Sequence, residues 1–295
     1  MTPIPVLCVL YRWMARHLSV PLAALVLTMS ALFPAWAASS ADSPSDTGKT
    51  QLLWLGQSAV RLTTPGGKVI LIDPFITQNP KTPAQYKNLD ALGRIDLILV
   101  THAHADHLGD GPELAKKQHI PLIGSAGLDQ SLVDLGVLPA ELAPRMDKSG
   151  TITPLGEGIK ITMVHAEHTS ALEWLNPATH QTETHVGGDP VGFIIELENG
   201  FKLWVMGDTG LFSDMKFIAD YYRPDLVLMP IGGHYTMDPK DAAYAVRYWI
   251  HPRLVLPYHY GTFPVLTGTP EEFIKAIGPT RTKVLDLKPG GTLTF

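Results

Sequence analysis

The sequence predicts an α/β fold in which helices flank two mixed β-sheets. Two turns are typical of β-hairpins: Pro-Gly-Gly at residues 65–67 and Asn-Gly at residues 199–200. Residues 95–100 form a continuous apolar run, as expected of a strand buried on both faces. The last third of the chain alternates short apolar runs with helix patterns. Hairpins combined with βα units require antiparallel and parallel pairs, so both sheets should be mixed.

The first half of the folded region is expected to be rich in short strands. Residues 52–62 and 68–72 are apolar, β-branched runs, and the Pro-Gly-Gly turn joins them as a hairpin. After the buried strand at 95–100 we expect, in order, a helix near residues 112–118, a strand at 121–123, a helix at 128–135 and a strand near 159–164.

The second half repeats strands and helices. The Asn-Gly turn should join strands 191–198 and 201–206. The helix predicted at residues 240–250 is marked by Asp238 as a cap, by Pro239 in the first turn and by apolar residues at helical spacing. The predicted order after the hairpin is a strand at residues 226–229, a helix at 240–250, a strand at 254–257, a helix at 271–277 and a closing strand at 283–287.

The N-terminal segment has the layout of a secretory signal peptide. Arg12 and Arg16 precede an apolar run at residues 18–33, and Ala-Trp-Ala at 35–37 resembles a cleavage site. We expect residues 1–37 to be removed, which would make the protein periplasmic or secreted. An uncleaved anchor is the alternative, but the run falls short of the roughly 20 residues of a spanning helix. No stable membrane span is expected after cleavage.

The mature chain should begin with a flexible tether at residues 38–50, followed by one folded domain at residues 51–295. Loss of Arg12 and Arg16 changes the formal charge from −5 to −5 − 2 = −7. Such an acidic body argues against nucleic acid as a partner. The only cysteine, Cys8, lies in the leader. Disulfides and thiolate metal ligands are therefore excluded from the mature chain.

Four potential metal ligands follow the buried strand at residues 95–100. His102, His104, Asp106 and His107 fall within six residues. Imidazole and carboxylate groups at this density suit Zn²⁺ or a similar divalent ion. A solvated polar turn would not need this combination of residue types.

The pattern His-x-His-x-Asp-His after a buried strand resembles the signature motif of the metallo-β-lactamase superfamily. Further segments of this chain match the superfamily in order: Ile-Asp-Pro-Phe at residues 72–75, then residues 168–170, 206–214, 230–237 and 259–264. Together they are similar to a bacterial group of metal-dependent hydrolases related to ascorbate-6-phosphate lactonase. The resemblance spans residues 51–295 and implies an αββα sandwich.

The resemblance also implies how two divalent metal ions are held. One ion would take His102, His104 and His168, the other Asp106, His107 and His259, and Asp208 would bridge them. Zinc is expected, although Mn²⁺ or Fe²⁺ also suits a site with two carboxylates.

The implied reaction is hydrolysis of a small-molecule substrate. A metal-bridging hydroxide would cleave an ester, lactone, amide or phosphodiester bond, because a bound metal lowers the pKa of water toward about 7. Asp106 and Asp208 are the expected catalytic carboxylates, with Asp106 also carrying a proton.

Several residues near the motif are candidates for supporting roles. Asp73 ends a strand and is expected to orient a ligand histidine through a hydrogen bond. His165, His234 and Tyr235 are candidate substrate-binding residues. The polar insert at residues 171–190 is expected to rim the pocket.

His165 and His168 compete for one ligand position. They lie three residues apart, so in an extended strand they would point to opposite faces. The resemblance runs through His168, and we therefore expect His168 to bind metal and His165 to lie in the pocket wall.

Two other functions remain open at this stage. Export favours a periplasmic β-lactam hydrolase, but the mature chain lacks the cysteine of a thiolate-containing second site. A non-catalytic metal-binding module of the cell envelope would use the same fold without turnover. Since fold and metal do not fix the substrate, the bond that is cleaved stays undetermined.

Overall fold

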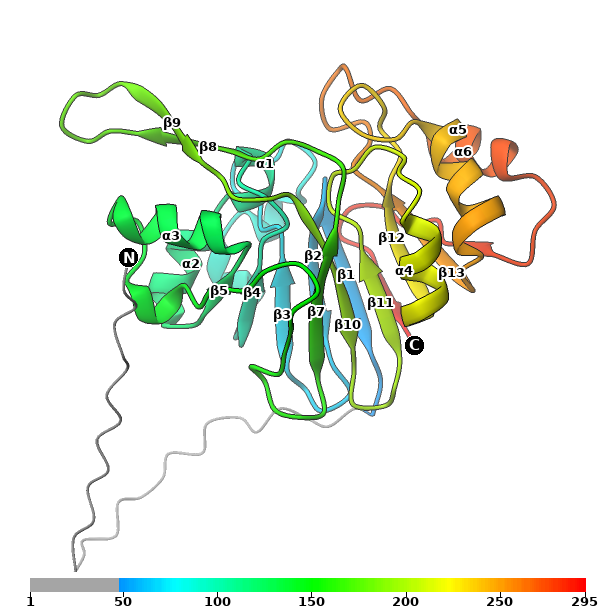
Figure 1. Ribbon diagram of the computed structural model, residues 1–295, viewed down its shortest axis with the longest axis horizontal. Helices are drawn as coiled ribbons and strands as arrows, with labels where there is room; N and C mark the ends of the chain where they lie inside the picture. Colours follow the sequence, from blue (N-terminus) through cyan, green and yellow to red (C-terminus); the bar gives the residue numbers. More distant parts are fainter. Residues whose placement is uncertain (1–47) are drawn as a thin grey trace, which may run out of the picture. The chain divides into compact units, whose positions relative to one another are not determined.

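The structure, a computed structural model, describes residues 48–295 and contains two large β-sheets packed face to face (Figure 1). The first sheet has the order β15-β1-β2-β3-β4-β5, with β1 (Gln51–Gly56), β2 (Ala59–Thr63), β3 (Val69–Ile72), β4 (Leu97–Leu99), β5 (Leu122–Ile123) and β15 (Thr292–Thr294). The second has the order β14-β13-β12-β11-β10-β7-β6, with β6 (Thr151–Ile152), β7 (Lys160–His165), β10 (Val191–Glu196), β11 (Lys202–Val205), β12 (Leu226–Pro230), β13 (Leu254–Tyr258) and β14 (Lys283–Val284). The predicted signal peptide and residues 38–47 of the predicted tether lie outside the described residues.

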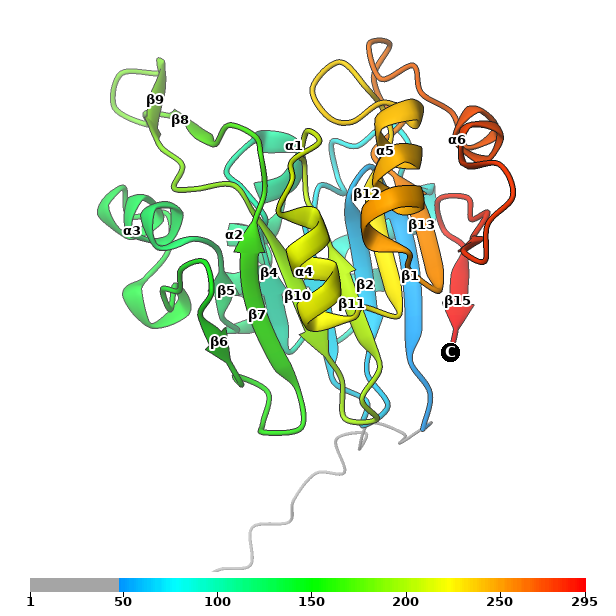
Figure 2. The same cartoon turned by 45° about the vertical axis from the view of Figure 1, so that its right-hand side comes forward.

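Helices cover the outer face of each sheet and complete the four layers of the sandwich (Figure 2). The first sheet carries α1 (Ala105–Leu108), α2 (Gly111–Gln118) and α3 (Ala126–Asp134), and the second carries α4 (Met215–Tyr222), α5 (Pro239–Ala245) and α6 (Pro270–Ile277). Both sheets contain antiparallel and parallel pairs. The predicted αββα sandwich of two mixed sheets is confirmed.

Strand β1 shows how the sequence separates the layers. Leu52 and Trp54 pack into the core between the two sheets, while Leu53 and Leu55 pack under the helices of the first sheet. Successive side chains of a strand point to opposite faces, so an apolar run feeds both cores. This explains why β1 reads as a continuous apolar segment.

Both predicted hairpins are confirmed. In the first, the Thr64 N–H donates to the Lys68 carbonyl at 2.8 Å, which closes the turn between β2 and β3. In the second, the Leu197 N–H donates to the Phe201 carbonyl at 2.9 Å, between β10 and β11. Gly200 has φ +80°, a conformation that glycine adopts without strain.

Two predicted boundaries were wrong, and one predicted helix keeps its extent but changes type. Residues 52–62 form two strands, because a turn at Gln57 and Ser58 separates β1 from β2. The strand predicted at 283–287 ends at Val284. The helix predicted at 240–250 changes at Val246 from an α-helix to a π-helical turn (Val246–Ile250).

Several short elements were not predicted. They include α4, β6, β15 and the pair β8 (Ala171–Leu175) and β9 (Thr182–Val186), which form a separate two-stranded sheet. This β8–β9 hairpin occupies the polar insert and lies beside α3, where the Ser131 hydroxyl donates to the Val186 carbonyl at 2.7 Å. Among residues 48–295, no helix combines the length and apolar character needed to cross a membrane.

Strand β15 closes the free edge of β1. Gln51 pairs with Thr294, and Thr50 and Phe295 exchange two backbone hydrogen bonds of 3.2 and 2.9 Å. Thr50, which we expected at the end of the tether, is fully buried.

Candidate metal centre

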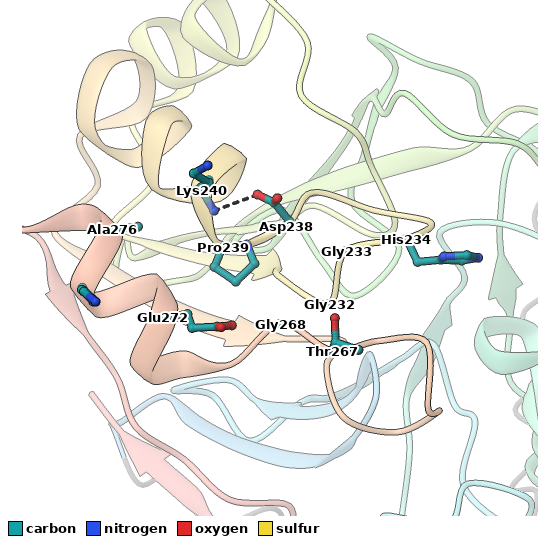
Figure 3. Close-up of a pocket in the computed structure, with 11 residues that line it drawn as sticks. Gly232, Gly233, His234, Asp238, Pro239, Lys240, Thr267, Gly268, Glu272 and Ala276 are labelled. Carbon is teal, nitrogen blue, oxygen red and sulfur yellow. Dashed lines mark hydrogen bonds between the residues drawn. The ribbon is translucent and has the colours of Figure 1, made fainter.

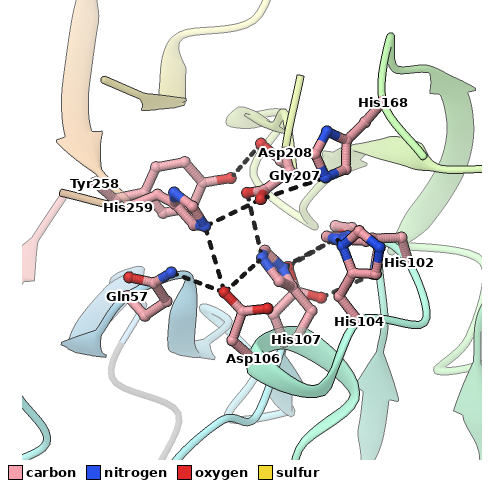
Figure 4. A network of polar contacts seen from close by, with 12 residues as sticks. Gln57, His102, His104, Asp106, His107, His168, Gly207, Asp208, Tyr258 and His259 are labelled. Atoms are coloured by element: carbon pink, nitrogen blue, oxygen red, sulfur yellow. Dashed lines mark hydrogen bonds and ion pairs between the residues drawn. The ribbon is translucent and has the colours of Figure 1, made fainter. Parts of the chain in front are cut away.

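The predicted metal ligands come together where strands of both sheets end. Strands β1 and β3 run parallel to β4 in the first sheet, and β7 runs in the same direction as β11, β12 and β13 in the second. The C-terminal ends of such strands meet at one edge, where α/β proteins commonly build their sites. The segments beyond these ends carry His102, His104, Asp106, His107, His168, Asp208 and His259 (Figure 4).

The first group consists of three histidines. Nitrogen atoms of His102, His104 and His168 all lie within 4.8 Å of one another. His102 Nε2 and His104 Nδ1 are 2.9 Å apart. Three imidazole nitrogens this close together can supply three of the four ligands of a tetrahedral ion such as Zn²⁺.

The second group contains Asp106, His107 and His259, whose ligand atoms also lie within 4.8 Å of one another. His107 and His259 are buried, and the Asp106 side chain is 26% exposed. His259 Nε2 lies 3.6 Å from Asp106 Oδ2.

Asp208 lies between the two groups. Its Oδ1 is 3.2 Å from His107 Nε2, and its Oδ2 is 3.0 Å from His259 Nε2 and 3.7 Å from His168 Nε2. A third set of possible ligands, His102, His107 and Asp208, shares members with both groups. One carboxylate therefore reaches toward both ligand groups.

The cluster fits metal ions because its buried polar atoms lack other partners. Among the described residues, His107 Nε2, His259 Nε2 and Asp208 Oδ1 are buried and, apart from the close approaches between the ligands given above, have no hydrogen-bond partner. Leaving buried polar atoms unpaired costs about 1–3 kcal/mol each. Coordination of a cation would satisfy these atoms together.

The charges of the cluster also favour a cation. Burial raises the pKa of Asp208, but the positive charges of His259 and His107 outweigh it and hold this pKa well below its ordinary value. Burial lowers the pKa of His259, whereas Asp208 beside it raises the pKa to about 9. Burial and the neighbouring His107 lower the pKa of His102 well below its ordinary range. A neutral imidazole of this kind has a lone pair available for a metal.

Asp73 supports His107 from behind, as the sequence suggested. Its Oδ2 lies 2.8 Å from His107 Nδ1, and it also accepts from the Thr101 hydroxyl at 2.8 Å. The Thr101 N–H donates to the other oxygen of Asp73 at 2.8 Å. This carboxylate fixes the ring of His107 so that Nε2 faces Asp208.

Gln57 is a residue of the site that sequence reasoning missed. It follows β1, is almost fully buried, and its Nε2 donates to Asp106 Oδ2 at 2.9 Å. In the sequence, Gln57 follows a glycine within the apolar run 52–62, and this pair could have indicated a turn. The prediction treats the whole run as one strand. A turn at this position would have placed Gln57 at a strand end.

A cavity of about 550 Å³ opens in front of the ligands. Its lining includes five of the predicted metal ligands, His104, Asp106, His168, Asp208 and His259. The remaining lining residues are Phe75, Ala105, Thr169, Tyr235, Phe263 and Leu266. The predicted insert at residues 171–190 contributes none of these residues, because its β8–β9 hairpin packs beside α3.

Of the three predicted substrate-binding residues, only Tyr235 lines this cavity. The His165 ring packs edge-on against Phe212 at a centroid distance of 4.9 Å, and its Nε2 lies 3.4 Å from Glu167. His234 lines a neighbouring cavity instead (Figure 3). Its φ of +62° belongs to a tight turn, which presents the next residue, Tyr235, to the metal centre.

A family model described as a beta-lactamase superfamily domain matches residues 68–260, which include His102 to Asp208 and the buried His259. The chain belongs to the metallo-β-lactamase superfamily. A metal-dependent hydrolase of the UPF0173 group from Polaromonas sp. is 60% identical over 249 residues, which cover 84% of this chain and 91% of the relative. A UPF0173 metal-dependent hydrolase from Thermodesulfovibrio yellowstonii is 40% identical and covers 83% of this chain and 92% of its own.

Solved structures agree with this membership of the metallo-β-lactamase superfamily. The structure of Igni18, described as a novel metallo hydrolase from Ignicoccus hospitalis, has a TM-score of 0.69 and 31% identity, and the match covers 84% of this chain and 98% of that one. The chain is thus a metal-dependent hydrolase of this superfamily, with a histidine and aspartate cluster able to bind metal.

Proposed function

We propose that this chain hydrolyses an ester, lactone, amide or phosphodiester bond with two divalent ions. The three-histidine group would hold one ion, and the group of Asp106, His107 and His259 would hold the other. The position of Asp208 carries this proposal, since its two oxygens approach histidines of both groups. A bridging carboxylate is the usual means of holding two cations close together.

Zinc is the ion that the ligand set favours. Five of the seven ligands are histidines, which zinc accepts readily, while the two carboxylates also suit manganese or iron. No thiolate competes, because the sequence has no cysteine after Cys8.

The chemistry supplied by such ions is activation of water and polarisation of the scissile carbonyl or phosphoryl oxygen. The side chains of the protein perform the remaining tasks. Asp73 holds His107 in place, and Gln57 holds Asp106. Asp106 is the more exposed of the two carboxylates, at 26% against 4% for Asp208. It is therefore placed to take a proton from the attacking water and return it to the departing oxygen.

Metal content and turnover of purified protein test the proposal. We expect about two divalent ions per chain, loss of turnover on chelation and recovery when zinc is added back. Full turnover after verified removal of metal would contradict a metal-dependent mechanism. One tightly bound ion at full activity would contradict the use of two.

A pair of histidine variants tests the ligand assignment. His168→Ala should lose metal and turnover together, since its ring belongs to the first group. His165→Ala should keep its metal and lose at most about 10- to 100-fold in rate. The assignment is reversed if His165→Ala is the variant that loses metal.

A further inference from the structure

Apart from the metal ligands, the wall of the cavity is largely apolar. Phe75, Tyr235, Phe263 and Leu266 form this wall, and they come from three separate segments of the chain. Phe75 follows β3, Tyr235 follows β12, and the other two follow β13. Convergence of apolar side chains from three strand ends on one cavity is typical of a substrate pocket.

Backbone contacts hold these side chains in position. Phe75 lies against Gly109, where an added β-carbon would come within 2.7 Å of the Phe75 α-carbon. Phe263 and Leu266 belong to one turn, in which the Leu266 N–H donates to the Phe263 carbonyl at 3.0 Å. The rings of Phe75 and Phe263 lie 6.3 Å apart, at a distance typical of paired aromatic rings.

The wall is shielded at its base and open at its rim. Phe75 and Leu266 are 8% and 2% exposed, whereas Phe263 and Tyr235 are 36% and 60% exposed. The rings of Phe263 and Tyr235 are therefore accessible to a substrate that enters the cavity.

Away from the metal ligands, the described residues offer no charged side chain to an anionic substituent in this cavity. Among residues 48–295, no lysine or arginine lines it, and the hydroxyls of Thr169 and Tyr235 are the uncharged polar groups. An anion held against this wall, away from the histidines and the proposed metal ions, would lose its water without gaining an ionic partner, which is costly.

We infer that the substrate, which we test as a carboxylic ester, carries an uncharged apolar group that lies against the wall of Phe75, Tyr235, Phe263 and Leu266. This inference rests on the proposed hydrolytic function. In the reaction, water adds to the acyl carbon, the acyl C–O bond breaks, and the departing oxygen receives a proton from the water. A cavity of about 550 Å³ accommodates a molecule with one ring and a short chain.

Binding can be measured without turnover. Butyrophenone, a ketone with the shape of an uncharged aryl ester, is titrated into zinc-loaded protein by calorimetry. We expect binding that Phe263→Ala weakens by about tenfold, because the variant removes one face of the wall. The matched control Phe217→Ala, an exposed phenylalanine on α4, should leave binding unchanged. Absence of binding, or equal binding to Phe263→Ala, would overturn the assignment of the wall.

Turnover tests the charge preference with matched esters. 4-Nitrophenyl butyrate and 4-nitrophenyl hemisuccinate share a leaving group and a chain length but differ in one carboxylate. We expect kcat/KM for the butyrate to exceed that for the hemisuccinate by at least about tenfold. A preference for the hemisuccinate would overturn the inference while leaving hydrolysis intact. Binding of butyrophenone without cleavage of any ester would support the apolar wall and overturn the ester reaction.

Discussion

Gln57 contacts two metal ligands, Asp106 and His259, and also Trp54. Its side chain donates to Asp106, and its carbonyl accepts from the Trp54 indole at 3.0 Å and from the His259 N–H at 3.2 Å. Its φ of +51° is unusual for a residue other than glycine. Such strain costs about 1–3 kcal/mol and persists only where the surroundings enforce it. The turn after β1 therefore helps to position both Asp106 and His259.

The variant Gln57→Ala isolates the side-chain contribution. It removes the hydrogen bond to Asp106 and keeps the backbone contacts, so turnover or metal affinity should fall about 10- to 100-fold. Competition with a metal indicator measures the affinity of the second ion, and a thermal melt verifies folding. Gln181→Ala, at an exposed glutamine of the β8–β9 hairpin, is the control. Unchanged affinity and turnover in Gln57→Ala would show that the contact has no functional role.

The ligands were predictable from sequence, whereas their supporting residues were largely not. Four ligands fall within six residues after a buried strand, and few other patterns combine these residue types. Gln57 carries no comparable signal, because a single glutamine has many uses. Phe263 and Leu266 belong to the apolar wall only because the turn after β13 folds toward the metal centre. Such positions depend on tertiary contacts that a local pattern does not encode.

The end of α1 packs directly on the segment after β3. Gly109 has φ +40°, and a β-carbon there would lie 2.5 Å from the Pro74 carbonyl oxygen. Asp110 continues this contact by accepting from the Ile76 and Thr77 N–H groups, both at 2.9 Å. The element that carries the ligand motif thus also positions Phe75 in the apolar wall.

Substitution of two glycines separates this packing from backbone strain. Gly109→Ala combines a left-handed conformation with a clash, whereas Gly136→Ala, at φ +67°, meets no atom within 4 Å. We expect Gly136→Ala to lower the free energy of unfolding by about 1–2 kcal/mol, from strain alone. Gly109→Ala should lower it further and also reduce turnover. Chemical denaturation of both variants is the measurement, and equal losses would mean that the segment after β3 moves aside freely.

Short elements account for most of the errors in the predicted fold. The helix α4 carries Met215, Ile218, Ala219 and Tyr222 at helical spacing, so its signal was present but limited to two turns. Strand β15 has three residues, and only its pairing with β1 defines it. The β8–β9 hairpin alternates exposed with partly buried residues, and β9 contains a single apolar residue, Val186, so the hairpin has little apolar periodicity. The long strands and their turns were predictable because burial on two faces imposes continuous apolar runs.

The stability of the whole molecule should depend on pH through a buried carboxyl on α3. Asp129 is fully buried, and its Oδ1 accepts from the Gly124 N–H at 3.1 Å. Among the described residues its Oδ2 has no hydrogen-bond partner. Burial raises the pKa of Asp129 to about 7, and the Gly124 hydrogen bond and Arg145 oppose this rise only partly.

Proton binding by Asp129 determines whether stability rises or falls with pH. Between about pH 4 and pH 7 the folded state keeps a proton on Asp129 that the unfolded chain has released, so stability falls as pH rises through this range. At about 1.4 kcal/mol per pKa unit the loss amounts to a few kcal/mol. The free energy of unfolding of Asp129→Asn, measured relative to wild type in urea titrations, should therefore be higher at about pH 8 than at about pH 5. Asp134→Asn, exposed on the same helix, should show no such difference, and a pH-independent effect of Asp129→Asn would contradict the prediction.

The leader determines where the whole molecule would act. We expect export and cleavage after Ala37, because basic, apolar and small residues follow one another in the order of a signal peptide. Expression of the full chain in a Gram-negative host, fractionation and intact-mass measurement test this. A membrane-bound product that retains residues 1–37 would contradict cleavage and indicate that this segment anchors the protein to the membrane.

The pairing of β15 with β1 has a consequence for folding. Gln51 finds its partner Thr294 at the far end of the sequence, so this edge of the first sheet cannot form until nearly all of the chain is available. Contacts between such distant residues slow folding, because the entropy of closing a long loop is lost before strand pairing contributes any stabilisation. Until then β1 presents an unpaired edge, which is a template for association with other chains. Residues 292–295 therefore cover the edge of β1 late in folding, and they replace a six-residue edge strand by one of three residues, which offers a shorter template for association.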